Sequence, residues 1–280
     1  MNTLEIKNLC KSYEKFSLKN VSFSIEKGEI RGFIGRNGAG KTTTLKSILN
    51  LVHPDSGQVD FFGIPFEGNE KDIKQRIGYA VGGISYYRNK TIKDIVKVTK
   101  CFYKNWSDEQ YRRYLSVFSL DENKKLSDLS EGMKVKFHLM LALSHGAELL
   151  ILDEPTSGLD PVSREELLEI FLSLAEKGVS VLFSTHITSD LEKCADSITY
   201  IKNGEIIKTA PLDEFVGSYR IVNLEGNGKK SDDESFLGVS RTKNGATALI
   251  NEADSGRFDG SAVAMPTLES IMVHLEKEEI

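Results

Sequence analysis

The first third of the chain carries the alternation of apolar and polar residues that is typical of half-buried β-strands. Residues 4–9 and 21–25 follow this pattern, with polar positions between the apolar ones. Residues 29–34 form a short apolar run that leads directly into a glycine-rich loop, and residues 45–49 place their apolar side chains at helical spacing. The order predicted for this part is therefore strand, glycine-rich loop, helix.

The middle of the chain alternates between helical and strand-like segments. Residues 72–147 are largely helical and rich in aromatic residues, and residues 149–152 form an unbroken apolar run like that of a buried parallel strand. An amphipathic helix is predicted over 163–177 and another buried strand over 179–183. Strands that alternate with helices in this way predict an α/β fold with a parallel sheet.

The composition shifts after Pro211. Short strand candidates cover 219–224, 236–241 and 246–250, and Asn244-Gly245 is a hairpin signal between the last two. Residues 267–279 place an apolar stripe on one helical face. These elements predict a small α+β appendage, whose last helix we expect to pack on its own strands rather than to form a dimer contact.

Composition and charge narrow the classes of protein. The 280 residues are 40% hydrophobic and 28% charged, and the net charge of −5 provides no global basic field, which argues against a nucleic-acid partner. Cys10, Cys101 and Cys194 stand alone, which is typical of reduced thiols rather than of disulfides or a metal site. No signal peptide is predicted, and no apolar run reaches the roughly 18–20 residues that cross a bilayer.

The glycine-rich loop carries the first chemical motif. Gly35-Arg36-Asn37-Gly38-Ala39-Gly40-Lys41-Thr42 fits G-x-x-x-x-G-K-[ST], the P-loop pattern. Its glycines let backbone N–H groups converge on phosphate oxygens at a helix N-terminus. Lys41 is expected to reach the β- and γ-phosphates, and the Thr42 hydroxyl to ligate Mg²⁺. The strand before and the helix after the loop argue against a plain glycine-rich turn.

Two acidic residues, Asp153 and Glu154, directly follow the apolar strand at 149–152. Ligands of open parallel sheets bind outside the carboxyl ends of the strands. Asp153 is therefore expected to hold Mg²⁺, and Glu154 to orient and deprotonate the attacking water. Alone, such a pair is as often a solvated strand end, but the P-loop favours the catalytic interpretation.

Three further segments point to a family. Leu129-Ser130-Glu131-Gly132-Met133 precedes the acidic strand, Ser157-Gly158-Leu159-Asp160 follows it, and His186 follows the next strand. Over residues 1–211 the chain resembles the nucleotide-binding subunits of ABC transporters, with these segments similar to the signature motif, the D-loop and the switch histidine.

The resemblance implies a P-loop NTPase fold of the ABC ATPase type with an inserted helical subdomain. It implies a nucleotide-binding domain over 1–212, the helical part at about 85–147, and an accessory domain over 213–280. Two such subunits, identical or different, sandwich ATP, so that Ser130 and Gly132 act on the nucleotide of the partner, while His186 contacts the γ-phosphate. The implied nucleotide-binding residues are Tyr13, Gly35, Asn37, Gly38, Ala39, Gly40, Lys41, Thr42, Thr43, Ser130, Gly132 and Asp160. A tyrosine at position 13 is also compatible with simple packing in the core or at its rim.

One position departs from the family. The strand at 77–81 is normally followed by a glutamine or glutamate that contributes to the Mg²⁺ shell and links the nucleotide to the membrane partner, and Gly82 stands there. Glycine has no side-chain oxygen, but Mg²⁺ commonly keeps several waters, so we expect nucleotide binding to persist.

The resemblance further predicts a peripheral protein on the cytoplasmic face of a membrane, in a bacterium, with a separately encoded permease. It is closest to the ABC-2 type branch, which exports drugs, antimicrobial peptides or lipids. Two alternatives stay open: a soluble ABC ATPase acting on ribosomes or DNA, and an ATP-binding regulator without hydrolysis. The aromatic residues from Phe102 to Phe118 are expected to form the core of the helical part rather than a docking surface.

Overall fold

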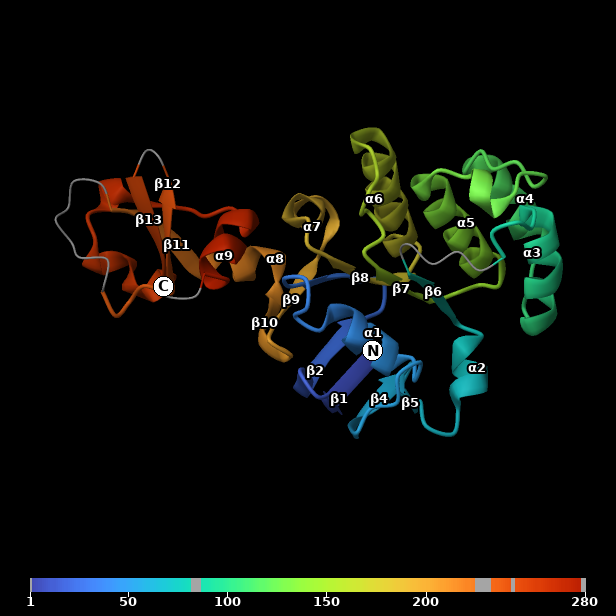
Figure 1. The fold of residues 1–280 in the computed structure, drawn as a ribbon, viewed down its shortest axis with the longest axis horizontal. Helices are drawn as coiled ribbons and strands as arrows, with labels where there is room; N and C mark the ends of the chain where they lie inside the picture. Colours follow the sequence, from blue (N-terminus) through green and yellow to red (C-terminus); the bar gives the residue numbers. More distant parts are fainter. Residues whose placement is uncertain (1, 82–86, 225–232, 243–244, 278–280) are drawn as a thin grey trace.

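A computed structural model describes residues 2–81, 87–224, 233–242 and 245–277. Two sheets and most helices lie in the part before residue 212, and a third sheet lies beyond it, on the far side of helix α8 (Leu212–Gly217; Figure 1). Gly82, the position that departs from the family pattern, lies outside the described residues.

The central sheet has six strands in the order β10-β9-β3-β8-β7-β6. Neighbouring strands are parallel except at the β9–β10 edge, which is antiparallel. Every residue of β3, β7 and β8 is buried, which accounts for the unbroken apolar runs in the sequence. The parallel α/β sheet is thus confirmed. Its strands are β3 (Ile30–Ile34), β6 (Ile77–Val81), β7 (Leu149–Asp153), β8 (Ser180–Thr185), β9 (Ser197–Lys202) and β10 (Glu205–Pro211).

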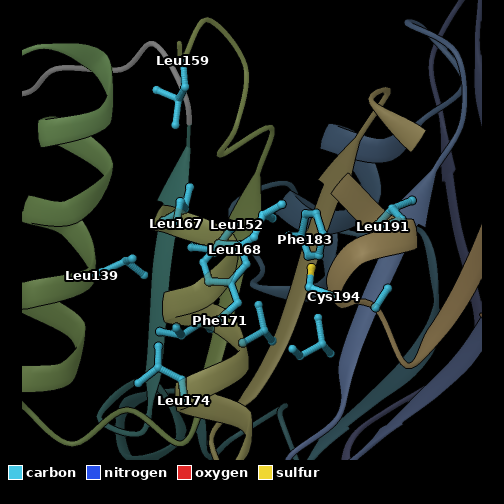
Figure 2. Packing of buried hydrophobic residues seen from close by; sticks show 14 of the residues in the cluster. Leu139, Leu152, Leu159, Leu167, Leu168, Phe171, Leu174, Phe183, Leu191 and Cys194 are labelled. Atoms are coloured by element: carbon cyan, nitrogen blue, oxygen red, sulfur yellow. The ribbon is translucent and has the colours of Figure 1, made fainter. Parts of the chain in front are cut away.

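Helices cover the central sheet. The predicted amphipathic helix is α6 (Pro161–Ala175), whose residues Leu167, Leu168, Phe171 and Leu174 pack toward the sheet, where the Phe171 and Phe183 rings lie 5.5 Å apart (Figure 2). The short helix α7 (Thr188–Cys194) adds Leu191 and Cys194 to the same core. Helix α1 (Lys41–Ile48) belongs to a second core, shared with an antiparallel sheet.

That antiparallel sheet has the order β2-β1-β4-β5. The predicted N-terminal strands are β1 (Asn2–Ser12) and β2 (Ser17–Glu26), and a hairpin of β4 (Ser56–Phe61) and β5 (Ile64–Pro65) completes it. Their inward side chains share a core with α1, which holds the loop before α1 between two sheets. The short helix α2 (Glu70–Lys74) leads to β6.

The helical part contains α3 (Ile92–Thr99), the 3-10 turn η1 (Lys100–Phe102), α4 (Asp108–Val117), η2 (Leu126–Asp128) and α5 (Glu131–Ser144). Tyr111 and Phe118 are buried and Trp106 packs against them, so the expectation of an internal aromatic core is confirmed for these residues. It is wrong for Phe102, which is 72% exposed, because the chain turns outward at η1.

The C-terminal sheet has the order β12-β13-β11-β14. Its strands are β11 (Tyr219–Asn223), β12 (Gly238–Thr242), β13 (Gly245–Asn251) and β14 (Val263–Ala264), joined by the 3-10 turns η3 (Glu252–Arg257) and η4 (Gly260–Ala262). The predicted strands and the β12–β13 pairing are confirmed, and Asn244 lies outside the described residues. Helix α9 (Leu268–Leu275) packs on β12 and β13, as expected, and also on α7.

Candidate nucleotide site

The P-loop connects the buried strand β3 to α1. The Ala39 amide donates to the Arg36 carbonyl at 3.1 Å, and the Lys41 ammonium folds back to donate to the carbonyls of Gly35 at 2.8 Å and Arg36 at 3.3 Å. Gly40 has a φ of +115°, and a Cβ there would lie 2.7 Å from the side chains of Phe16 and Leu18. Only glycine therefore fits this position.

The N-terminus of α1 is suited to an anion. Gly40 caps the helix without a side-chain hydrogen bond, and no acidic residue lies in its first turn. The first amide groups of a helix have no partner within the helix, and the helix dipole favours negative charge there. A phosphate group is the kind of ligand that such a loop and helix terminus bind.

The acidic pair lies at the end of β7, beside β8. Asp153 is 4% exposed and pairs in the parallel register with Ser184, whose hydroxyl donates to Asp153 Oδ1 at 2.6 Å. The same hydroxyl accepts from the Glu154 amide at 3.0 Å. Ser184 thus contacts both acidic residues. The sequence signal for it was weak: a single hydroxyl at the end of a buried apolar strand.

The Glu154 carboxylate contacts the other two predicted catalytic residues, Lys41 and His186. Its Oε1 lies 3.2 Å from Lys41 Nζ, and its Oε2 lies 2.8 Å from Nδ1 of His186. The backbone of Glu154 is left-handed, with φ of +51°, a conformation that costs a non-glycine residue energy and that gathers at functional sites. The three residues follow β7, β3 and β8, which are neighbours in the sheet, so the structure brings together Lys41, Glu154 and His186.

The oxygen donors suit Mg²⁺. Thr42 is exposed in the first turn of α1, and Asp153 offers the carboxylate that Ser184 orients. Mg²⁺ is usually held by one or two carboxylates together with substrate phosphates and water. The Asp153 carboxylate and the Thr42 hydroxyl are donors of the kind that such a site needs. Within the described ranges, no cluster of three or more His, Cys, Asp or Glu residues is placed to form an all-protein metal cage.

The signature and D-loop residues begin two helices. Ser130 caps α5 by accepting from the Met133 amide at 3.2 Å, and Asp160 caps α6 by accepting from the amides of Val162 and Ser163 at 3.0 Å. The Ser163 hydroxyl and amide hold the pKa of Asp160 below its usual range. The two helices lie side by side, since a Cβ on Gly132 would lie 3.4 Å from Ser163 Cβ.

These caps are separate from the Lys41–Glu154–His186 cluster within one subunit. Among the residues that the structure describes, no hydrogen bond or ion pair joins Ser130 or Asp160 to Lys41, Glu154 or His186. The structure therefore divides the predicted site residues into two groups.

Tyr13 is connected to the P-loop through Phe16. Its ring is 47% exposed, and the Lys11 ammonium lies 5.7 Å from the ring centroid. The Tyr13 amide donates to the Phe16 carbonyl at 2.8 Å, and Phe16 in turn packs on the P-loop at Gly40. An exposed aromatic ring beside a phosphate-binding loop is suited to stacking on a base.

Comparison with known proteins identifies the family. The family model described as ABC transporter matches residues 18–157. The bacitracin transport ATP-binding protein BcrA of Bacillus licheniformis is 39% identical over 206 residues, which cover 71% of this chain and 66% of BcrA. The Nod factor export ATP-binding protein I of Burkholderia orbicola is 34% identical over 216 residues, covering 74% of this chain and 71% of that protein.

Solved structures agree. An ATP-binding subunit of an ABC transporter superposes with a TM-score of 0.69 at 30% identity, covering 76% of this chain and 91% of that one. A dimeric ATP-binding cassette in a post-hydrolysis state, bound to ADP and Pi, gives a TM-score of 0.66 at 25% identity and covers 75% and 98%.

The chain therefore belongs to the ABC transporter family, as an ATP-binding, ATP-hydrolysing subunit with the P-loop NTPase fold. Subunits of this kind dimerise and work with separate membrane permease components. In the described part of the chain, no helix is long and apolar enough to cross a bilayer.

Proposed function

We propose that this subunit hydrolyses MgATP at the Lys41–Glu154–His186 cluster and thereby powers export of a small molecule or peptide through a separate permease. The observation that carries the proposal is the Glu154 carboxylate, held between the Lys41 ammonium at 3.2 Å and the His186 ring at 2.8 Å. A carboxylate in this position is suited to accept a proton from a water that attacks the γ-phosphate.

Each residue of the cluster has a distinct role in the proposed step. Lys41 exchanges the Gly35 and Arg36 carbonyls and Glu154 for the β- and γ-phosphates, whose charge it balances. Glu154, released from Lys41, orients and deprotonates the water. His186 stays hydrogen-bonded to Glu154 through Nδ1, which fixes its ring beside the γ-phosphate.

The Thr42 hydroxyl and the Asp153 carboxylate would hold Mg²⁺ in this scheme. When bound, the ion neutralises charge on the phosphates. The Ser184 hydroxyl orients Asp153 through its 2.6 Å bond and holds the Glu154 backbone through its amide. One side chain thereby sets the relative position of the metal-binding and water-activating carboxylates. Asn37, Gly38 and Thr43 complete the loop that would surround the phosphates.

The second group of residues would act across a dimer. Ser130 and Gly132 begin α5, and a helix N-terminus favours the negative charge of a γ-phosphate. Their separation from the cluster of their own subunit supports contact with the nucleotide of the partner. The Asp160 loop would lie at the same interface. The dimer pairs two identical chains or this chain with a second ATPase subunit.

The relatives support the proposed direction of transport and the proposed cellular location of the subunit. BcrA is named for bacitracin transport and the second relative for Nod factor export, which supports export and a bacterial source. We place the subunit at the cytoplasmic face of the membrane, with residues 1–212 as the nucleotide-binding domain and 213–280 as an accessory domain. The net charge of −5 supports a protein partner rather than nucleic acid.

The test is trapping of the ATP-bound dimer. Glu154→Gln keeps the hydrogen bond to His186 but removes the base, so MgATP should double the 31.2 kDa mass in light scattering and hydrolysis should fall by at least about 100-fold. Glu148→Gln, at the opposite end of β7, is the matched control and should hydrolyse ATP like the wild type.

Two results would count against the proposal. Hydrolysis by Glu154→Gln within about tenfold of the wild type would remove Glu154 from the role of base. Failure of Glu154→Gln to dimerise despite ATP binding would count against a homodimer that forms by itself and would require the permease or a different ATPase subunit as partner.

A further inference from the structure

A buried carboxylate outside the catalytic cluster has, within the described part of the chain, an oxygen without a hydrogen-bond partner. Asp190 lies in the first turn of α7 and is 1% exposed, and its Oδ2 has no hydrogen-bond partner among the described residues. Its Oδ1 lies 3.9 Å from Nε of Arg164 on α6, and that nitrogen is also buried without a hydrogen bond. A distance of 3.9 Å exceeds that of an N–H···O hydrogen bond, about 2.7–3.2 Å.

Stability does not account for this pair. Burial of the Asp190 charge costs several kcal/mol, and an arginine at 3.9 Å that makes no hydrogen bond to it recovers little of that cost. Two apolar residues of similar size would hold α6 to α7 at least as well, and both helices already contribute leucines to one shared core. A charged pair retained at such a place is suited to fixing the register of two elements.

The positions of the two residues show which elements they connect. Arg164 lies one helical turn after Asp160, and its amide donates to the Asp160 carbonyl at 3.0 Å. Asp190 lies four residues after His186, on the helix that follows it. The pair therefore joins the loop that carries Asp160 to the segment that carries His186.

We propose that Arg164 and Asp190 are positioning residues that couple the Asp160 loop to His186, so that dimer closure at that loop sets the histidine on the nucleotide. The inference rests on the proposed function, which places Asp160 at the dimer interface and His186 beside the γ-phosphate. A shortening of the distance between Arg164 Nε and Asp190 Oδ1 by about 1 Å would turn the two residues into a hydrogen-bonded ion pair. A misplacement of about 1 Å of a group in an active site can cost up to about 100-fold in rate.

A second ion pair between the same helices serves as the control. Lys193 of α7 pairs with Glu165, the residue next to Arg164, and both side chains are about half exposed, at 51% and 50%. Exposed pairs contribute little. Glu165→Gln therefore removes a charge from the same helix turn and leaves Arg164 and Asp190 unchanged.

The first experiment compares steady-state ATP hydrolysis by the full chain. Asp190→Asn keeps the shape and removes the charge, and it should lower kcat about tenfold with KM for MgATP within about twofold. Glu165→Gln should match the wild type. Arg164→Gln should behave like Asp190→Asn, and because Arg164 is 29% exposed it carries the comparison if Asp190→Asn fails to fold.

The second experiment asks whether the pair acts through the histidine. In a His186→Ala background, Asp190→Asn should cause no further loss of kcat, since the group it positions is gone. Restoration of most activity by Asp190→Glu would support the same conclusion.

The results that overturn the inference are distinct. Values of kcat for both Asp190→Asn and Arg164→Gln within twofold of the wild type would overturn it, as would a further tenfold loss in the His186→Ala background. If His186→Ala itself leaves kcat unchanged, the proposed role of His186 fails and the inference fails with it. If His186→Ala lowers kcat but the pair variants do not, the inference alone fails.

Discussion

Replacement of Ser184 by alanine tests the link between the two acidic residues of the site. The Ser184 hydroxyl is fully buried, donates to Asp153 Oδ1 at 2.6 Å and accepts from the Glu154 amide at 3.0 Å. Among the residues that the structure describes, no other side chain is hydrogen-bonded to both acidic residues. Ser184→Ala removes these bonds and adds no bulk.

The expected magnitude follows from the two bonds. A hydrogen bond to a charged group contributes about 1.5–3 kcal/mol, and the bond to buried Asp153 is of this kind. The Glu154 amide loses less, because the Ser184 carbonyl also accepts from it at 3.1 Å. We expect a loss of about 2–3 kcal/mol in the free energy of unfolding, or about 5–10 °C in Tm.

Activity should fall further than stability alone explains. Without the hydroxyl, the Asp153 carboxylate is free to rotate, and the left-handed backbone of Glu154 loses one of its restraints. We expect kcat for ATP hydrolysis to fall about tenfold. The assay is steady-state phosphate release at a temperature well below both melting transitions.

Ser180→Ala is the matched control. Ser180 is buried in the same strand at its other end, where its hydroxyl accepts from the Gly28 amide and lies 3.0 Å from both the Thr3 hydroxyl and the Glu26 carbonyl. Its loss should destabilise the protein to a similar degree and leave kcat within twofold. Equal kcat for Ser184→Ala and Ser180→Ala would refute the positioning argument.

The remaining predictions concern binding and pH. Lys41→Ala should weaken ATP binding about 100-fold, measured by calorimetry, because the buried cation that balances the phosphates is gone; Lys46→Ala in the same helix should bind normally. Tyr13→Ala should weaken ATP binding about fivefold, whereas Tyr13→Phe should not, if the exposed ring stacks on the base. Burial lowers the pKa of His145 to about 4, whereas the unfolded chain takes up this proton near 6.5. The stabilisation is therefore complete above pH 6.5, and a fall from pH 7 to 5 should cost about 2 kcal/mol in urea unfolding, a slope that His145→Phe should flatten.

The sequence predicted the elements that have a strong pattern or a motif. The buried strands were found because their apolar runs are unbroken, and helix α6 was found because its apolar residues recur at helical spacing over 15 residues. Helix α7 was not predicted, since it has seven residues and buries only Asp190, Leu191 and Cys194. A helix of two turns has no repeated stripe to detect.

The site was predictable as a list of residues but not as a geometry. The P-loop and acid motifs placed Lys41 and Glu154 at strand ends, yet the role of Ser184 depends on its register opposite Asp153. An alternating hydrophobic pattern fixes register where one face of a strand is buried, but β7 and β8 are buried at every position and have no such alternation. The Arg164–Asp190 pair escaped prediction because it joins two helices through their shared core.

Helix α7, which begins two residues after His186, is held by neighbours on three sides. Leu191 of α7 packs on β3 so closely that a Cβ on Gly32 would lie 2.3 Å from it. Arg164 of α6 faces Asp190, and the Leu268 amide of α9 donates to Glu192 at 2.8 Å. Because α7 has only seven residues, we expect displacement of any one of these neighbours to shift the whole helix and, with it, His186 just before its first turn. Helix α7, which follows His186, therefore contacts the P-loop strand, the Asp160 helix and the C-terminal helix. The C-terminal elements also reach β9, the neighbour of the P-loop strand, where Tyr200 donates to Glu276 at 2.9 Å and Lys202 donates to the Leu275 carbonyl at 2.6 Å. The segment at 213–280 is thus joined to the ATPase at two places next to the site, and neither contact involves a residue expected to touch the nucleotide.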